Sequence, residues 1–198
     1  MQLRDVCVRY GTQRVLDRFS LSLPKHGVVA LMGPSGVGKT TLLRVMMGLE
    51  PIESGTVDTG GAKIACLFQE DRLLPWLTAA ENVAAVLPRG EQARARQTLE
   101  ALGLPEEAAD KTPDALSGGM RRRVALARLV CFDGDIWLMD EAFKGLDVDS
   151  KRRVMDTLMP YAAQRLLVVV THDRAEAAYL GAHVIELDGP PARVVNRG

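Results

Sequence analysis

The chain has 198 residues, 47% of them hydrophobic, and its 25 Lys and Arg residues balance its 25 Asp and Glu residues. That length suits one domain able to bury well over half of its unfolded surface, and the lack of a positive excess argues against a sequence-independent nucleic-acid binder. We expect no membrane span, because no apolar run approaches about 18–20 residues. We expect no signal peptide, because the first residues lack a charged-then-apolar layout. A disulfide scaffold is not expected either, because the three cysteines (Cys7, Cys66 and Cys131) are scattered along the chain.

The first part of the chain predicts paired strands, then a strand, a glycine-rich turn and a helix. Residues 6–10 and 14–23 have the β-branched content of two paired strands, with Gly11 at the turn. Residues 28–32 form a continuous apolar run, as expected of a strand covered on both faces. The apolar residues within 40–48 are spaced as in a buried helix that ends at Gly48.

The middle of the chain, residues 73–116, predicts helices only. Thr78 and Glu81 have the spacing of a capping box that opens one helix, and residues 91–102 predict a second helix ended by Gly103. No strand signal interrupts this stretch. We therefore expect a helical subdomain inserted into the fold.

Two further strand-and-helix pairs follow. Apolar residues 136–139 and 166–170 each end in polar residues, and helix-like stretches over 149–158 and 173–180 come next. Residues 184–187 and 193–195 are again strand-like. This repetition predicts an α/β fold with a parallel sheet, in which ligands bind beyond the carboxyl ends of the strands.

The glycine-rich turn fits the phosphate-binding pattern G-x-x-x-x-G-K-[ST] and lies between a predicted strand and helix, as that pattern requires. Glycines allow backbone N–H groups to face phosphate oxygens, and the helix that begins near Lys39 directs its positive end to the same anion. The Lys39 ammonium suits the terminal phosphates, and the Thr40 hydroxyl can bind Mg²⁺. The pattern therefore predicts a nucleotide site at Gly33, Pro34, Ser35, Gly36, Val37, Gly38, Lys39 and Thr40.

Two other segments suit the same chemistry. Asp140 and Glu141 follow an apolar strand, and adjacent carboxylates at a strand end point in different directions, so one can serve a metal and the other the attacking water. In the segment 116–120 (LSGGM), Ser117 is a good N-cap residue. Gly118 and Gly119 would leave the start of the next helix accessible, and phosphate is the natural ligand there.

With these motifs in this order, the chain resembles the ATP-binding subunit of ABC transporters along essentially its whole length. The corresponding segments are the glycine loop (33–41), glutamine loop (68–70), signature (116–120), magnesium strand (136–141), D-loop (145–147) and switch histidine (171–173). Residues 68–78, with LSGGM in place of LSGGQ, resemble the nitrate/sulfonate/taurine importer group. The resemblance implies a RecA-like phosphate-loop core (1–68 and 121–198), an N-terminal antiparallel β subdomain and an inserted helical subdomain (69–120).

The resemblance also implies ATP and Mg²⁺ as cofactors and a role for each matching side chain. Tyr10 would stack on adenine, and Thr41 would complete the phosphate loop. Thr40 and Asp140 would bind Mg²⁺. Gln69 would complete the shell of Mg²⁺ and water and would sense the permease. Glu141 would act as general base or position the water, and His172 would contact the γ-phosphate and orient Glu141.

Partners follow from the resemblance as well. Two copies would close head to tail as a homodimer, with Ser117, Gly118 and Gly119 capping the ATP of the partner and Asp147 lying across the interface. Integral-membrane permease subunits would hold the chain at the cytoplasmic face of the inner membrane, with an indirect link to a solute-binding protein and no role for nucleic acid. The permease would contact residues 73–77, although these residues could instead pack inside the helical subdomain.

The chain departs from the family pattern at two positions and carries an arginine run. Ala142 stands where Pro is common, and Lys144 stands where a small residue is common, which leaves the D-loop geometry open. The run from Arg121 to Arg123 is interpreted as solvated charge, the alternative being positive potential near the ATP of the partner. Since no catalytic residue is missing, we expect an active ATPase.

Two other classes of protein compete with the importer subunit. A soluble ABC ATPase acting on ribosomes or DNA usually carries tandem nucleotide sites or long coiled-coil insertions, which 198 residues do not accommodate. A small phosphate-loop kinase or GTPase would leave LSGGM unexplained. The two asparagines, Asn82 and Asn196, do not supply the Asn-Lys-x-Asp base reader of a GTPase.

Overall fold

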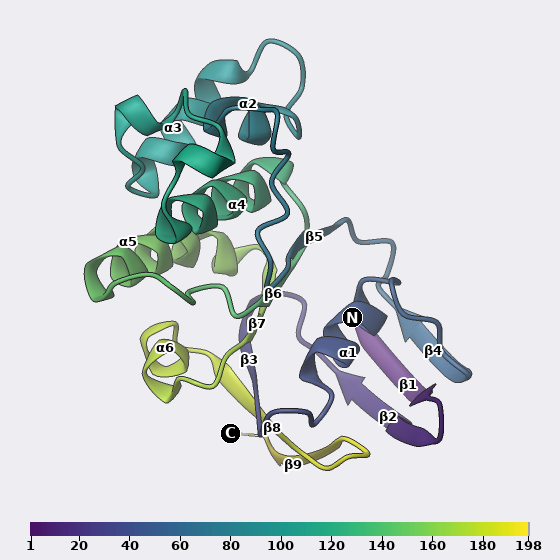
Figure 1. Ribbon diagram of the computed structural model, residues 1–198. Helices are drawn as coiled ribbons and strands as arrows, with labels where there is room; N and C mark the ends of the chain where they lie inside the picture. Colours follow the sequence, from purple (N-terminus) through teal and green to yellow (C-terminus); the bar gives the residue numbers. More distant parts are fainter. Residues whose placement is uncertain (198) are drawn as a thin grey trace. The chain divides into compact units, whose positions relative to one another are not determined.

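A computed structural model describes residues 1–197 and divides the chain into two compact units (Figure 1). Unit 1 comprises residues 1–64, 135–140 and the chain from 162 onward, and unit 2 comprises residues 65–134 and 141–161. Within the described part of the chain, every helix is too short or too polar to span a bilayer.

Unit 1 contains a three-stranded antiparallel sheet with the order β2-β1-β4. Its strands are β1 (Gln2–Tyr10), β2 (Gln13–Ser22) and β4 (Ser54–Asp58). The pairing of β1 with β2 confirms the predicted paired strands. The sequence did not indicate β4, because most of its residues are exposed and it shows no apolar alternation.

The second sheet of unit 1 is largely parallel. Strand β3 (Gly27–Met32) pairs in parallel with β7 (Leu166–Val170) and with β8 (His183–Asp188), and β7 pairs in parallel with β6 (Ile136–Asp140). Strand β9 (Arg193–Arg197) is antiparallel to β8, and β5 (Ile64–Leu67), where the chain passes into unit 2, is the sixth strand, in the order β5-β6-β7-β3-β8-β9. The uniformly buried β6 and β7 confirm the predicted parallel α/β sheet.

Two helices of unit 1 follow strands of this sheet. Helix α1 (Lys39–Met46) comes after β3 and buries Leu42, Leu43, Val45 and Met46. These side chains join Val29, Leu31, Leu138 and Val168 in one hydrophobic core. Gly48, in the left-handed conformation, ends the helix as predicted, and α6 (Arg174–Tyr179) follows β7.

Unit 2 is helical. It contains α2 (Ala79–Ala84), α3 (Gln92–Ala101), α4 (Gly118–Phe132) and α5 (Val148–Leu158), with short 3₁₀ turns at Glu106–Ala108, Pro113–Ala115 and Met159–Ala163, the last ending in unit 1. Helices α2, α3 and α4 pack on one another (Figure 1). The capping box at α2 is confirmed, since Thr78 Oγ1 accepts from Glu81 N and the Glu81 carboxylate accepts from Thr78 N. The helical subdomain predicted over residues 69–120 lies within unit 2, and its independence stays a prediction.

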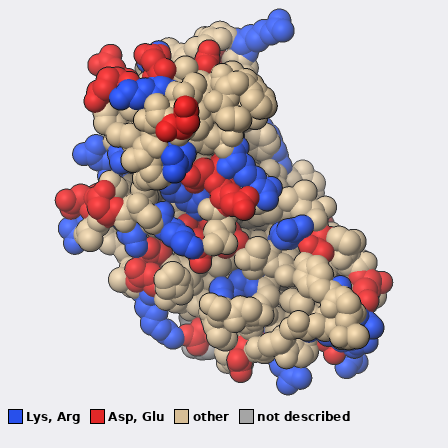
Figure 2. All heavy atoms as spheres, viewed as in Figure 1, with Lys and Arg blue, Asp and Glu red and all other residues tan. Residues whose placement is uncertain are grey.

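Charges of both signs are spread over the surface. Figure 2 shows Lys and Arg interspersed with Asp and Glu on the visible face, without one large patch of either sign. This distribution agrees with the zero formal net charge.

Candidate active site

The glycine loop follows β3 directly, and its glycines adopt conformations that other residues avoid. Gly33 has a φ of 145°, and a Cβ atom there would lie 2.3 Å from the carbonyl oxygen of Leu187 in β8. Gly38 is the N-cap of α1 with a φ of 109°, and a Cβ atom there would lie 2.8 Å from Val15 Cγ1. Backbone and side-chain neighbours therefore require glycine at both positions.

The loop presents its tip to solvent and anchors itself by one apolar side chain. Pro34, Ser35 and Gly36 are exposed, whereas Val37 is fully buried. The Lys39 ammonium donates hydrogen bonds to the carbonyl oxygens of Gly33 and Pro34, each over 2.8 Å. Because Lys39 is also the first residue of α1, its charge and the positive end of the helix lie at the same place.

Two oxygen donors meet beside the start of α1. The Thr40 hydroxyl donates to Asp140 Oδ2 over 2.9 Å, and Asp140, the last residue of β6, is only 5% exposed. Among the described residues, no group of three or more His, Cys, Asp or Glu side chains could hold a metal ion. One hydroxyl and one carboxylate are the hard donors that suit Mg²⁺, which is commonly held by few protein oxygens together with substrate phosphates.

His172 lies near the glycine loop, at the end of β7. It is exposed and lines a cavity of about 510 Å³ together with Gly33 and Pro34. The ion pair between Arg174 and Glu186 also borders this cavity, and the sequence pattern had not singled out either residue. The structure thus brings the predicted switch histidine and the glycine loop to one opening.

Tyr10 ends β1 with its side chain 46% exposed. Partial burial, and then the neighbouring Glu50 carboxylate, raise the pKa of its hydroxyl, which also interacts with Thr41. A partly exposed ring beside the half-buried Thr41 is compatible with stacking on a base, and the contact with adenine remains a prediction.

In unit 2, Glu141 has a left-handed backbone conformation with a φ of 48°. Its Oε2 atom lies 2.7 Å from Lys144 Nζ, and the Glu141 side chain is 25% exposed. The Lys144 departure from the family pattern therefore places an ammonium on the carboxylate predicted to serve the attacking water.

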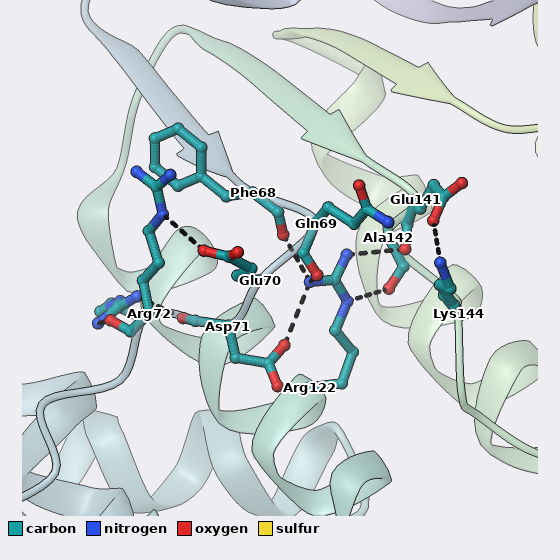
Figure 3. Close-up of polar contacts among 10 residues, drawn as sticks. Phe68, Gln69, Glu70, Asp71, Arg72, Arg122, Glu141, Ala142 and Lys144 are labelled. Carbon is teal, nitrogen blue, oxygen red and sulfur yellow. Dashed lines mark hydrogen bonds and ion pairs between the residues drawn. The ribbon is translucent and has the colours of Figure 1, made fainter. Parts of the chain in front are cut away.

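The glutamine loop contacts Arg122, a residue that was not among the site residues predicted from the sequence. The Gln69 side chain is exposed, and the backbone carbonyls of Phe68 and Gln69 face the guanidinium of Arg122 in α4 (Figure 3). Arg122 is 3% exposed. A signal was present, because Arg122 lies four and seven positions before Leu126 and Leu129, both buried on the same helix face.

The interpretation of the arginine run as solvated charge is therefore wrong. Arg121 donates to the carbonyl oxygens of Pro113 and Leu116, and Arg123 donates to those of Gly119 and Gly103. Arg121 and Arg123 are half-buried and Arg122 is buried. The cations that would oppose the helix dipole are instead paired with carbonyl groups.

The signature and the D-loop adjoin within unit 2. Ser117 is the N-cap of α4, and its hydroxyl accepts from Met120 N over 3.2 Å. Ser117 and Gly118 are exposed, and a Cβ atom on Gly119 would lie 3.5 Å from the carbonyl oxygen of Gly145. The start of α4 is therefore accessible from solvent, as predicted for a surface that receives a phosphate.

Asp147 has a local role that the sequence pattern did not indicate. It is the N-cap of α5 and accepts hydrogen bonds from Ser150 N and Ser150 Oγ over 2.9 and 2.7 Å. These bonds favour the charged carboxylate and lower the pKa of Asp147. Its predicted place across a dimer interface stays a prediction.

The three cysteines are free thiols, as predicted. Cys131 is buried, and Cys7 and Cys66 are half-buried. Burial raises the pKa of the Cys66 thiol to about 11, so this residue is protonated at neutral pH and poorly suited to nucleophilic chemistry.

Comparison with known proteins identifies the family of the chain. Residues 16–144 match the family model described as ABC transporter. The chain is 40% identical over 197 residues to the aliphatic sulfonates import ATP-binding protein SsuB 2 of Xanthomonas axonopodis pv. citri, covering 95% of this chain and 67% of that protein. It is 38% identical to the taurine import ATP-binding protein TauB of Rhizobium johnstonii, covering 96% of this chain and 78% of that protein.

A solved structure has the same fold. The ATP-binding cassette MJ0796, in a dimeric post-hydrolysis state bound to ADP and Pi, superposes with a TM-score of 0.86 at 28% identity, covering 100% of this chain and 97% of that chain. A second dimeric structure of MJ0796 gives a TM-score of 0.82 over 93% of both chains. The chain therefore belongs to the ABC transporter family and is an ABC ATPase related to the sulfonate and taurine import ATP-binding proteins.

Proposed function

We propose that this ABC ATPase energises an importer of small organic sulfonates, of which taurine is one. The observation that carries the proposal is the 38–40% identity, over nearly the whole chain, to proteins named for the import of aliphatic sulfonates and of taurine. The segment from Phe68 to Thr78, which lies in unit 2, supports the same group.

The residues of unit 1 would bind the nucleotide. Backbone N–H groups of the glycine loop and the start of α1 would receive the phosphates, with the Lys39 ammonium at the terminal ones. Thr40 and Asp140 would hold Mg²⁺, with Gln69 completing its shell. When bound, Mg²⁺ neutralises charge on the phosphate oxygens. Tyr10 would stack on the adenine, and Thr41 would complete the phosphate loop.

Hydrolysis would depend on positioning and charge. Glu141 would accept a hydrogen bond from the attacking water and act as general base, and His172 would donate to the γ-phosphate and orient the water. Phosphoryl transfer of this kind needs no covalent intermediate. Glu141 and His172 are the catalytic side chains that the sequence predicts.

Two copies would form the working unit, head to tail. The accessible start of α4 supports this, because Ser117, Gly118 and Gly119 would cap the ATP held by the partner. Asp147 would lie across that interface. The relative MJ0796 is dimeric in its post-hydrolysis structure with ADP and Pi.

Permease subunits would hold the pair at the cytoplasmic face of the membrane, and a solute-binding protein would deliver the sulfonate to them. Trp76 supports a contact there, because it is 72% exposed in a segment whose Leu73, Leu74 and Leu77 are only half-buried. An exposed Trp among leucines suits a protein interface. The buried Asn82 side chain holds this segment by hydrogen bonds to the backbone of Leu74 and Leu77.

Three experiments test the proposal. Glu141→Gln is expected to bind ATP, lose turnover and accumulate a dimer in light scattering; turnover at the wild-type rate would remove Glu141 from its role. Ser117→Arg is expected to block dimer closure while the monomer keeps its nucleotide affinity, and loss of that affinity would contradict capping in trans.

For the solute, a strain lacking this chain is expected to stop growing on taurine or alkanesulfonates as sole sulfur source and to grow normally on sulfate. Normal growth on all three would reject the sulfonate assignment.

A further inference from the structure

Arg122 is a buried cation whose hydrogen bonds run to two separate segments of unit 2. Its side chain is 4% exposed, and burying a guanidinium is unfavourable unless its five N–H groups find acceptors. Nη1 donates to Phe68 O over 2.7 Å and to Asp71 Oδ1 over 3.2 Å, and Gln69 O lies 3.4 Å from it. Figure 3 shows this guanidinium between the glutamine loop and the segment of Glu141.

The other edge of the guanidinium holds the backbone at Glu141. Nη2 donates to Glu141 O over 2.7 Å, and Nε donates to Ala142 O over 2.9 Å. Two N–H donors in the fixed geometry of one guanidinium hold the carbonyls of Glu141 and Ala142 more tightly than a single ammonium could.

This contact coincides with backbone strain. Glu141 has a φ of 48°, a conformation that non-glycine residues adopt rarely and keep only where their surroundings enforce it. The bonds from Arg122 to the carbonyls of Glu141 and Ala142 are such surroundings. Without them the Glu141 backbone would relax, and its carboxylate would point elsewhere.

One rigid group therefore joins the glutamine loop to Glu141, although the two segments lie about 70 residues apart in sequence. Phe68 O and Glu141 O each accept a 2.7 Å bond from the same planar guanidinium. A displacement of residues 68–71 consequently acts on the backbone at Glu141 through a single side chain.

We propose that Arg122 is a positioning residue for ATP hydrolysis: it fixes the Glu141 carboxylate and transmits movement of the glutamine loop to it. The inference rests on the role proposed above for Glu141. It goes beyond that role, because it assigns the link between the two motifs to a residue that belongs to neither of them.

The test compares Arg122→Gln and Arg122→Lys with Arg128→Gln. Arg128 is a matched control, because its guanidinium donates to the carbonyls of Asp71 and Arg72 in the same loop. We expect kcat to fall at least tenfold in both Arg122 variants, since misplacing a catalytic group by about 1 Å can lower the rate on the order of a hundredfold. KM and nucleotide affinity should change by less than about twofold. Arg128→Gln leaves the bonds from Arg122 to Glu141 and Ala142 in place, so it should lower kcat by a smaller factor than either Arg122 variant.

A double-mutant cycle tests the link itself. If Arg122 acts through the glutamine loop, Arg122→Gln and Gln69→Ala together should lower kcat less than the product of their separate effects. Additive effects would overturn the link, and a wild-type kcat in a folded Arg122→Lys, or equal losses in the Arg122 and Arg128 variants, would overturn the positioning role. Glu141→Gln separates the two proposals: if it retains turnover, the proposed role of Glu141 fails, whereas if it is inactive and Arg122→Gln is fully active, only the present inference fails.

Discussion

Lys144 Nζ lies 2.7 Å from Glu141 Oε2, three residues earlier in the chain. The ammonium is 58% exposed and the carboxylate 25% exposed, so this ion pair is largely solvated and contributes little to stability. The ion pair matters for catalysis because Lys144 contacts an oxygen atom of the Glu141 carboxylate, which we propose faces the attacking water.

Lys144→Ser should raise turnover modestly. The ion pair competes with the water for Glu141, and an exposed pair of about 0.5 kcal/mol corresponds to roughly a twofold change in rate. Steady-state ATPase measurements at low and high salt check this, because added salt should raise the wild-type rate toward that of the variant. Lys144→Arg is the control and should behave as wild type. A fivefold loss of kcat in Lys144→Ser would show instead that Glu141 needs the ammonium.

Asp140→Asn should uncouple Mg²⁺ from nucleotide binding while leaving the fold intact. The asparagine amide oxygen can still accept the Thr40 hydrogen bond, but the site loses its charge. We expect Mg²⁺ affinity to fall by at least about tenfold, with nucleotide binding in the presence of EDTA unchanged. Fluorescent-nucleotide titrations with and without Mg²⁺ measure both. Equal Mg²⁺ dependence in wild type and variant would reject Asp140 as a ligand.

Gly33→Ala should destabilise unit 1 by about 2–3 kcal/mol, because the new Cβ atom would lie 2.3 Å from a backbone oxygen of β8 and the residue would keep a strained φ. Gly36→Ala is the matched control. It shares a positive φ of 79° but has open space around a Cβ atom, so about 1 kcal/mol is expected. Urea unfolding compares the two variants. Equal losses would mean that the contact with Leu187 is unimportant.

The acid sensitivity of α5 should depend on Asp147. The hydrogen bonds from Ser150 lower the pKa of Asp147, so its contribution to stability is complete above the ordinary pKa of an aspartate and is lost as pH falls through the lowered folded-state value. Unfolding measured at about pH 6 and about pH 3 should show a larger loss for wild type than for Asp147→Asn, whose side chain caps the helix without titrating. Parallel losses in the two proteins would contradict this assignment.

Much of the fold follows from local pattern. Continuous apolar runs predict β3 and β7, and the capping box at Thr78 predicts the start of α2. Both signals depend only on residues that are neighbours in the sequence. The exposed strand β4 carries no such signal and escaped prediction. The glycine loop was predictable for the same reason: its residue types are dictated by backbone conformation.

The side-chain contacts of Arg122 and Lys144 could not be predicted from the sequence. A run of three arginines gives no direct sign that Arg122 alone turns inward, and the sequence does not reveal that Lys144 meets Glu141. Both depend on side-chain direction and on partners brought together by tertiary packing. Only the helical spacing of Arg122 with Leu126 and Leu129 offered a clue.

The close approach of Gly33 to Leu187 also determines when during synthesis the nucleotide site can form. Strand β3, which leads into the glycine loop, pairs with β7 and β8, and both emerge from the ribosome more than 130 residues later. A nascent chain that stops short of β8 would therefore carry the whole glycine loop and still lack the backbone against which Gly33 is seated. Nascent chains should therefore retain ATP only after β8 has left the ribosome.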